Sequence, residues 1–106
     1  LNQHLTNLIS STIPNPEKEP VFSRQVEQKR ILASLILKYK LSRQQLTCLY
    51  WLLRGYTDLE IASILELSPR TIESYINILK LKLYCEDRKS IIKKAFAEEF
   101  HDMPLI

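Results

Sequence analysis

The chain has 106 residues, enough for one compact domain with an additional segment, and it contains a single glycine. So little glycine argues against a β-rich fold, and it excludes the glycine-rich loops that commonly cradle nucleotide phosphates. The net charge is only +3, and the longest apolar run, residues 31–37, is too short to span a bilayer. We therefore expect an all-α protein with no membrane segment and no cofactor.

The first forty residues are predicted to form a short segment, a linker and one helix. Apolar residues recur at helical spacing over residues 1–13, and three prolines follow within residues 12–22. Prolines this dense favour an extended connector. Residues 1–22 are therefore expected to be an N-terminal segment and proline-rich linker. Ser23 is expected to cap a connecting helix over residues 23–40.

The next helix is predicted to begin at a capping box. Ser42 and Gln45 have the spacing at which each side chain accepts a hydrogen bond from the other's backbone N–H, and the helix should run to about Arg54. Gly55 follows, at the left-handed position after a helix where a Cβ is costly. The expected buried stripe consists of Leu46, Leu49, Tyr50 and Leu53.

Two short helices joined by a tight turn are predicted within residues 57–83. Thr57 and Glu60 form a second capping box for the first of them. Ser68 and Pro69 open the other, because a serine hydroxyl caps a helix and proline suits its first position. Apolar side chains fall where two steeply crossed helices would meet: Ile61, Ala62, Leu65, Leu67, Ile72 and Tyr75. The unit is a helix-turn-helix, whose usual role is to lay its second helix in the major groove of DNA.

A last helix is predicted over roughly residues 88–99, capped by Asp87. If its apolar side exceeds what a small core can absorb, the excess is expected to form a dimer seam. The residues of this seam would be Ile91, Ile92, Ala95 and Phe96. The region of residues 31–39 offers another seam, and intramolecular cover of the domain is the alternative for both. Residues 101–106 are expected to be a C-terminal tail.

Cysteine and histidine usage points away from metal binding and catalysis. Cys48 and Cys85 lack CxxC spacing and favour reduced thiols in a cytoplasmic protein. His4 and His101 lie near opposite ends, so no metal site is expected. Cys48 falls in an apolar helical stretch, which favours a buried thiol over a nucleophile. The sequence suggests no Ser/His/Asp or Cys/His arrangement. We expect the protein not to be an enzyme.

An ordered series of short motifs runs through residues 41–97. These motifs are Leu41-Ser42, Gly55, Glu60-Ile61-Ala62, the run from Leu67 to Glu73, and Lys82-Leu83. With them the region resembles the LuxR/GerE-type C-terminal helix-turn-helix of bacterial transcription regulators. The resemblance implies a four-helix domain over residues 41–100 whose third helix reads DNA and whose fourth often dimerises. Such domains usually follow a sensor domain, which residues 1–40 do not resemble, so an upstream sensor is expected to be absent from this chain.

Two positions depart from the family pattern at places where glycine is common. Glu66 stands in the turn of the helix-turn-helix, and Tyr84 follows the Lys-Leu pair. A non-glycine residue in the left-handed conformation costs about 1 kcal/mol. We therefore expect the turn at Glu66 to be tolerable but strained.

Helical geometry selects the face of the recognition helix, about residues 69–83, that is free to meet DNA. Its buried stripe is predicted to be Ile72, Tyr75, Ile76, Leu79 and Leu83. The predicted base contacts on the other side are Arg70, Glu73, Ser74, Asn77 and Ile78. Among them, Asn77 suits adenine and Glu73 the amino group of cytosine. The predicted phosphate contacts are Arg43, Arg54, Thr57, Ser68, Thr71, Lys80, Lys82 and Arg88.

The sequence thus predicts a sequence-specific regulator of transcription that binds double-stranded DNA. Residues 41–100 contain nine basic and eight acidic side chains, so this region is nearly neutral. Nonspecific affinity for DNA comes mainly from the counterions that basic side chains release from the phosphates. A monomer should therefore bind weakly, and we expect a homodimer. The alternative is a helical protein-interaction module that kept the helix-turn-helix but lost DNA affinity. The near-neutral charge, the acidic Glu73 and the exposed Ile78 and Leu81 favour this alternative.

Overall fold

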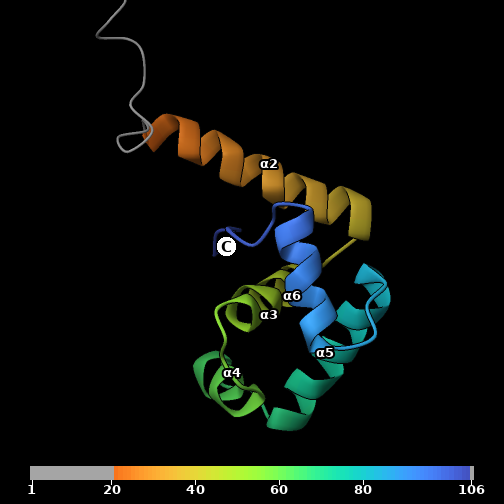
Figure 1. The fold of residues 1–106 in the computed structure, drawn as a ribbon. Helices are drawn as coiled ribbons and strands as arrows, with labels where there is room; N and C mark the ends of the chain where they lie inside the picture. The colour runs from red at the N-terminus through yellow and green to blue at the C-terminus, as the bar shows by residue number, and fades with distance from the viewer. Residues whose placement is uncertain (1–20, 106) are drawn as a thin grey trace, which may run out of the picture.

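The computed structural model describes residues 21–105, and this part of the chain is helical without any strand. The helices are α2 (Val21–Tyr39), α3 (Arg43–Leu53), α4 (Asp58–Leu65), α5 (Pro69–Leu83) and α6 (Arg88–Ala97) (Figure 1). The all-α prediction is confirmed for this range. The predicted N-terminal segment and most of the linker lie outside the described residues.

One hydrophobic core joins these helices, with α5 at its centre. α5 contacts α3, α4 and α6, and α3 also contacts α4. The largest fully buried side chains of these four helices are Leu46, Leu49, Leu52, Ile61, Ile72, Leu79, Leu83 and Ile91. Burial of these apolar surfaces supplies most of the driving force for the fold.

The buried face of α3 is broader than the predicted stripe. Leu46 and Leu49 are buried as expected, but Tyr50 and Leu53 are only half-buried. Leu52 and Cys48 are completely buried in their place. Because both α4 and α5 pack against α3, more than one side of this helix is covered.

α2 forms a separate layer with the residues that follow α6. It lies across one end of the helix bundle, while α4 and the start of α5 lie at the opposite end (Figure 1). Leu35 and Tyr39 of α2 are buried in the same core cluster as Phe100 and Met103. The expected cover of the domain by residues 31–39 is thus intramolecular. The C-terminal residues are not a free tail, since Met103 is wholly buried.

Glu98 ties these two parts of the chain together. Its carboxylate accepts hydrogen bonds from the Tyr39 hydroxyl and, over 3.0 Å, from the Lys38 ammonium. Lys94 adds an ion pair at 3.4 Å from the last turns of α6. Burial would raise the pKa of Glu98, but the hydrogen bonds from Tyr39 and Lys38 lower it.

The predicted helix starts are confirmed at four of five positions. Both capping boxes form, Ser42 with Gln45 and Thr57 with Glu60, and the backbone N–H of Thr57 lowers the pKa of Glu60. Ser68 and Asp87 accept from the third residue of α5 and α6 in the same way. The cap predicted at Ser23 is wrong: α2 begins at Val21, which places Ser23 inside the helix and moves residues 21–22 out of the predicted linker.

Left-handed residues end several helices of the described chain. Gly55 has φ +87°, as predicted after α3, and Glu66 has φ +56° at the end of α4. Tyr84, at the other position where glycine is common in the family, has φ +59° at the end of α5. The strain expected at Glu66 is therefore present, and three other non-glycine residues of the described chain share it: Lys40, Tyr84 and Glu99.

Glu66→Gly is expected to raise the free energy of unfolding by up to about 1 kcal/mol, because glycine adopts this conformation without a Cβ penalty. The greater freedom of glycine in the unfolded chain reduces the gain. Urea unfolding followed by circular dichroism measures the difference. Glu86→Gly is the matched control, since Glu86 is exposed and has no positive φ. An equal or larger gain in the control would contradict the strain argument.

Candidate nucleic-acid interface

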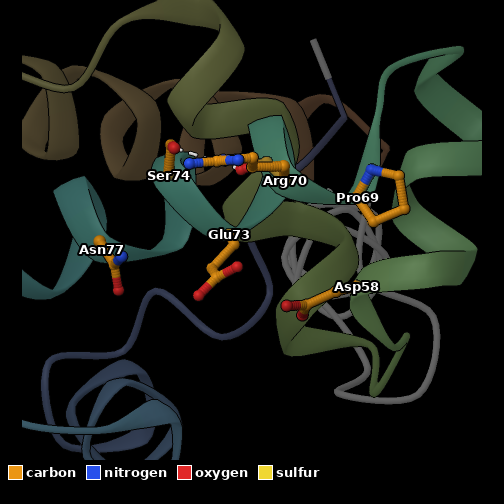
Figure 2. A pocket seen from close by; sticks show the side chains of 6 residues that line it. All are labelled: Asp58, Pro69, Arg70, Glu73, Ser74 and Asn77. Carbon is orange, nitrogen blue, oxygen red and sulfur yellow. Dashed lines mark hydrogen bonds between the residues drawn. The ribbon is translucent and has the colours of Figure 1, made fainter.

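The exposed side of α5 borders a shallow hollow next to the first turn of α4. The hollow measures about 540 Å³ and is lined by Asp58, Pro69, Arg70, Glu73, Ser74 and Asn77. Figure 2 shows these side chains around the space between the two helices, with Asp58 contributed by α4. Four of the five predicted base-contact residues therefore lie together on one surface.

The orientation of α5 follows from its buried stripe. Ile72, Ile76, Leu79 and Leu83 are buried as predicted. Tyr75 is half-buried, and its hydroxyl donates to Gln44 of α3 over 2.9 Å. Because one side of the helix is fixed in the core, the opposite side is held outward.

The predicted reading residues differ in how free they are. Arg70, Glu73 and Asn77 are exposed. Ser74 is exposed too, but its hydroxyl donates to the Arg70 carbonyl over 3.2 Å, which leaves the oxygen to accept. Ile78 is half-buried, contrary to the expectation that it is exposed, because it lies one turn from Tyr75 on the flank of the buried stripe.

Two of the predicted phosphate contacts lie beside the reading residues. Lys80 and Arg88 line a second hollow with Glu73 and Asn77. Among the caps, the hydroxyls of Thr57 and Ser68 are used to accept from helix N–H groups. Thr71 hydrogen-bonds Ser68 over 2.8 Å. These three residues fix the starts of α4 and α5. The backbone N–H groups at a helix start, rather than these hydroxyls, are the groups that would bind phosphate.

Two cations of the predicted set of phosphate contacts make hydrogen bonds within the domain. Lys82 donates to the Lys40 carbonyl over 2.7 Å and to Gln45 over 2.8 Å, so it ties α5 to the end of α2 and the start of α3. Arg54 lies over the Tyr50 ring and donates to the Met103 carbonyl. Both side chains are therefore held by hydrogen bonds inside the domain.

Arg43 is also separated from the reading residues. It is exposed, but it lines a different hollow together with Leu65, Leu67 and Tyr75. Leu65 is half-buried and Leu67 exposed, so the helix-turn-helix covers them less than predicted.

Asp58 is the member of the surface that sequence reasoning missed. It is the first residue of α4 and forms an ion pair with Arg88 at 2.6 Å, which joins the first turns of α4 and α6. The only sequence signal for it is its place directly after the cap Thr57, in the helix that crosses α5. Both side chains are more than one third exposed, so the pair is worth about 0.2–1 kcal/mol of stability.

The predicted dimer seam on α6 is only partly available. Ile91 and Ala95 are completely buried in the core of their own chain, which rules them out as interface residues. Ile92 is half-buried, and Phe96 is 61% exposed with its ring stacked on His101. A seam on this helix is therefore reduced to Ile92 and Phe96.

The remaining observations concern metal ligands, membrane helices and the buried thiol of the described residues. Among residues 21–105, no group of three His, Cys, Asp or Glu side chains is placed to hold a metal ion. No helix in this range has the length and hydropathy needed to cross a membrane. Cys48 is wholly buried, and burial raises the pKa of its thiol to about 11, as expected of an inert thiol.

The arrangement of the helices agrees with the comparison to known families. A family model described as bacterial regulatory proteins, luxR family, matches residues 39–95, more than half of the chain. The chain belongs to this family. The luxR-family match spans α3, α4 and α5 and most of α6, and it leaves out nearly all of α2 and the C-terminal residues after Ala95. A family of regulatory proteins agrees with the prediction that the chain is not an enzyme.

Curated relatives of this luxR-family chain include a regulator from several Brucella species. The HTH-type quorum sensing-dependent transcriptional regulator VjbR of Brucella ovis is 38% identical over 64 residues, and those of Brucella abortus and Brucella melitensis match equally well. The alignment covers 60% of this chain but only 25% of each relative. The search of solved structures gave no match.

Proposed function

We propose that this chain is a sequence-specific DNA-binding domain of a transcription regulator, with α5 inserted in the major groove. The observation that supports this most directly is the two-sided character of α5. One side is buried, and the other presents Arg70, Ser74 and Asn77 to solvent, with no covering element among residues 21–105. A polar outward helix with free donors and acceptors matches the way helix-turn-helix proteins read base edges.

Each residue of the outward face has a proposed role. The Asn77 amide pairs with adenine, and the Glu73 carboxylate accepts from the amino group of cytosine. Arg70 binds guanine or a phosphate, depending on how deeply α5 enters the groove. The N-terminal amides of α5, beginning at Ser68, anchor a phosphate, and Lys80 contacts the DNA backbone. Of the relatives' role, we propose transcriptional regulation for this chain.

We further propose that the domain acts as a dimer and receives its signal from a sensor domain outside this chain. The near balance of charge in residues 41–100 limits the affinity of a single copy. Of the predicted seam residues on α6, Ile92 and Phe96 remain accessible for contact between copies. Analytical ultracentrifugation that finds a strict monomer at high concentration, with and without DNA, would remove the dimer.

Selection of bound sequences from a random DNA pool tests the proposed function. An enriched palindrome would establish DNA reading, dimer symmetry and half-site spacing together. Binding to the selected duplex should weaken steeply as salt rises. Failure to enrich any sequence would favour the protein-interaction module, for which the acidic Asp58 and Glu73 and the 76% exposed Leu81 are the supporting features.

Asn77→Ala is expected to weaken binding to the selected duplex about 5- to 150-fold, since a bidentate contact to a base contributes about 1–3 kcal/mol of discrimination. Binding to unrelated duplex should change little. Fluorescence anisotropy with both duplexes measures the two effects. Gln28→Ala is the matched control, since it removes a similar exposed amide that lines a hollow with Arg54 and His101 and without any residue of α5. Equal behaviour of the two variants would exclude Asn77 from base reading.

A further inference from the structure

The ion pair between Asp58 and Arg88 stands on the surface that the proposed function assigns to DNA. The carboxylate lies 2.6 Å from the guanidinium, and both residues line the hollow that also contains Glu73, Asn77 and Lys80. Asp58 additionally lines the hollow formed by the start of α5, and Figure 2 shows its carboxylate in the space below Glu73. Asp58 therefore borders the reading residues in both hollows, and Arg88 borders them in one.

Arg88 is the cation of this surface that a neighbouring carboxylate neutralises. Its guanidinium is 39% exposed at the side chain, so solvent and a DNA phosphate can approach it. Lys80, which lines the same hollow, makes no ion pair within the described residues. With Asp58 and Glu73 present, the two cations near the reading residues face two carboxylates, and the local charge is balanced.

The stability of the fold gives little reason for this pair. Half-exposed ion pairs contribute little, because water screens the charges and two side chains must be held in one geometry. Arg88 is also the first residue of α6, where the helix dipole disfavours a cation. Asp58 is favourably placed as the first residue of α4, where the helix dipole favours a carboxylate, but this term does not require a partner. The effect of the pair on an approaching anion is therefore its more informative property.

We propose that Asp58 limits the DNA affinity of the domain by neutralising Arg88, so that a backbone phosphate has to compete with this carboxylate for the guanidinium. The inference rests on the proposed function and deepens it. Asp58 is then a positioning residue that acts through Arg88 and contacts no base. Loss of its charge frees one cation for the DNA backbone and leaves the reading residues of α5 unchanged.

The test is Asp58→Asn, which removes the charge and keeps the shape of the side chain. Binding to the selected duplex is measured by fluorescence anisotropy at several salt concentrations. We expect several-fold tighter binding at about 0.1 M salt and a salt slope steeper by about 0.9, the value for one added phosphate contact. Asp58→Ser gives the same removal of charge with a side chain that also suits a first helical turn, and thermal unfolding checks that both variants fold.

A double-mutant cycle separates the release of Arg88 from a general change of charge. In the Arg88→Gln background, Asp58→Asn should no longer steepen the salt slope. Glu99→Gln is the charge-matched control, since Glu99 is exposed and lies beside α2 rather than α5.

Each outcome decides the matter. Tighter binding with a steeper slope that requires Arg88 supports the inference. No gain, or an equal gain in the Arg88→Gln background or in Glu99→Gln, overturns the inference while wild-type binding leaves the proposed function intact. If the wild-type protein shows no salt-dependent binding to any duplex, the proposed function fails and the inference fails with it.

Discussion

Met103→Ala is expected to lower the free energy of unfolding by about 2–5 kcal/mol, the range found for truncation of a buried methionine or leucine. Met103 is completely buried although it lies beyond the part of the chain that matches the family model. Met103 belongs to the same core cluster as Leu35 of α2, and its backbone N–H donates to the Phe100 carbonyl over 3.1 Å, so the cavity would open inside this core. Urea unfolding followed by circular dichroism measures the loss.

Leu105→Ala is the control for this prediction. Leu105 lies two residues further along and is 49% exposed, so its truncation should change stability by no more than about 0.5 kcal/mol. Equal effects of the two substitutions would mean that the C-terminal residues do not pack as described. A large effect of Met103→Ala alone makes α2 and the C-terminal residues part of one cooperative unit with the helix-turn-helix.

The helix starts were predictable because capping is a local interaction. The side chains of Ser42 and Thr57 bond groups only three residues away, and the structure contains both capping boxes as predicted. Gly55 was predictable for a related reason, since a left-handed end is a property of the residue and its immediate neighbours. The left-handed turn at Glu66 was expected from the family resemblance alone. Ser23 shows the limit of this reasoning, because α2 already begins at Val21 and needs no cap at that position.

Long-range contacts were not predictable in the same way. Nothing in the local pattern joins Lys82 to the carbonyl of Lys40, or Arg54 to the carbonyl of Met103. Both cations therefore seemed free for phosphate. The burial of Met103 has the same origin, since it depends on a helix about seventy residues earlier in the chain.

The reading surface was predictable in part, because it combines a local pattern on α5 with a contact from another helix. The outward face of α5 follows from helical periodicity alone, and Arg70, Glu73 and Asn77 are exposed as predicted. Asp58 enters the same surface because α4 crosses α5, and the angle of that crossing cannot be derived from periodicity. A residue contributed by a neighbouring helix is thus the kind of site residue that single-sequence reasoning misses.

Leu79→Ala is expected to destabilise the domain by about 2–5 kcal/mol, because Leu79 is completely buried on the side of α5 that packs in the core. Domains of this size are stable by about 5–15 kcal/mol, so the loss is a large fraction of the total. Thermal and urea unfolding measure it. Since the same packing holds the opposite side of α5 outward, hydrogen exchange of the α5 amides should rise together with the loss of stability.

Leu81→Ala, two residues along the same helix, separates the stability of α5 from its function. Leu81 is 76% exposed, so the substitution should leave the unfolding midpoint almost unchanged. A destabilisation equal to that of Leu79→Ala would contradict the orientation of α5 on which the whole reading surface depends. If instead Leu81→Ala folds normally and keeps DNA binding, the exposed leucine serves neither the core nor the groove. A protein partner would then be the remaining reason for its exposure, and the DNA-reading face and a protein-binding face would lie on the same helix.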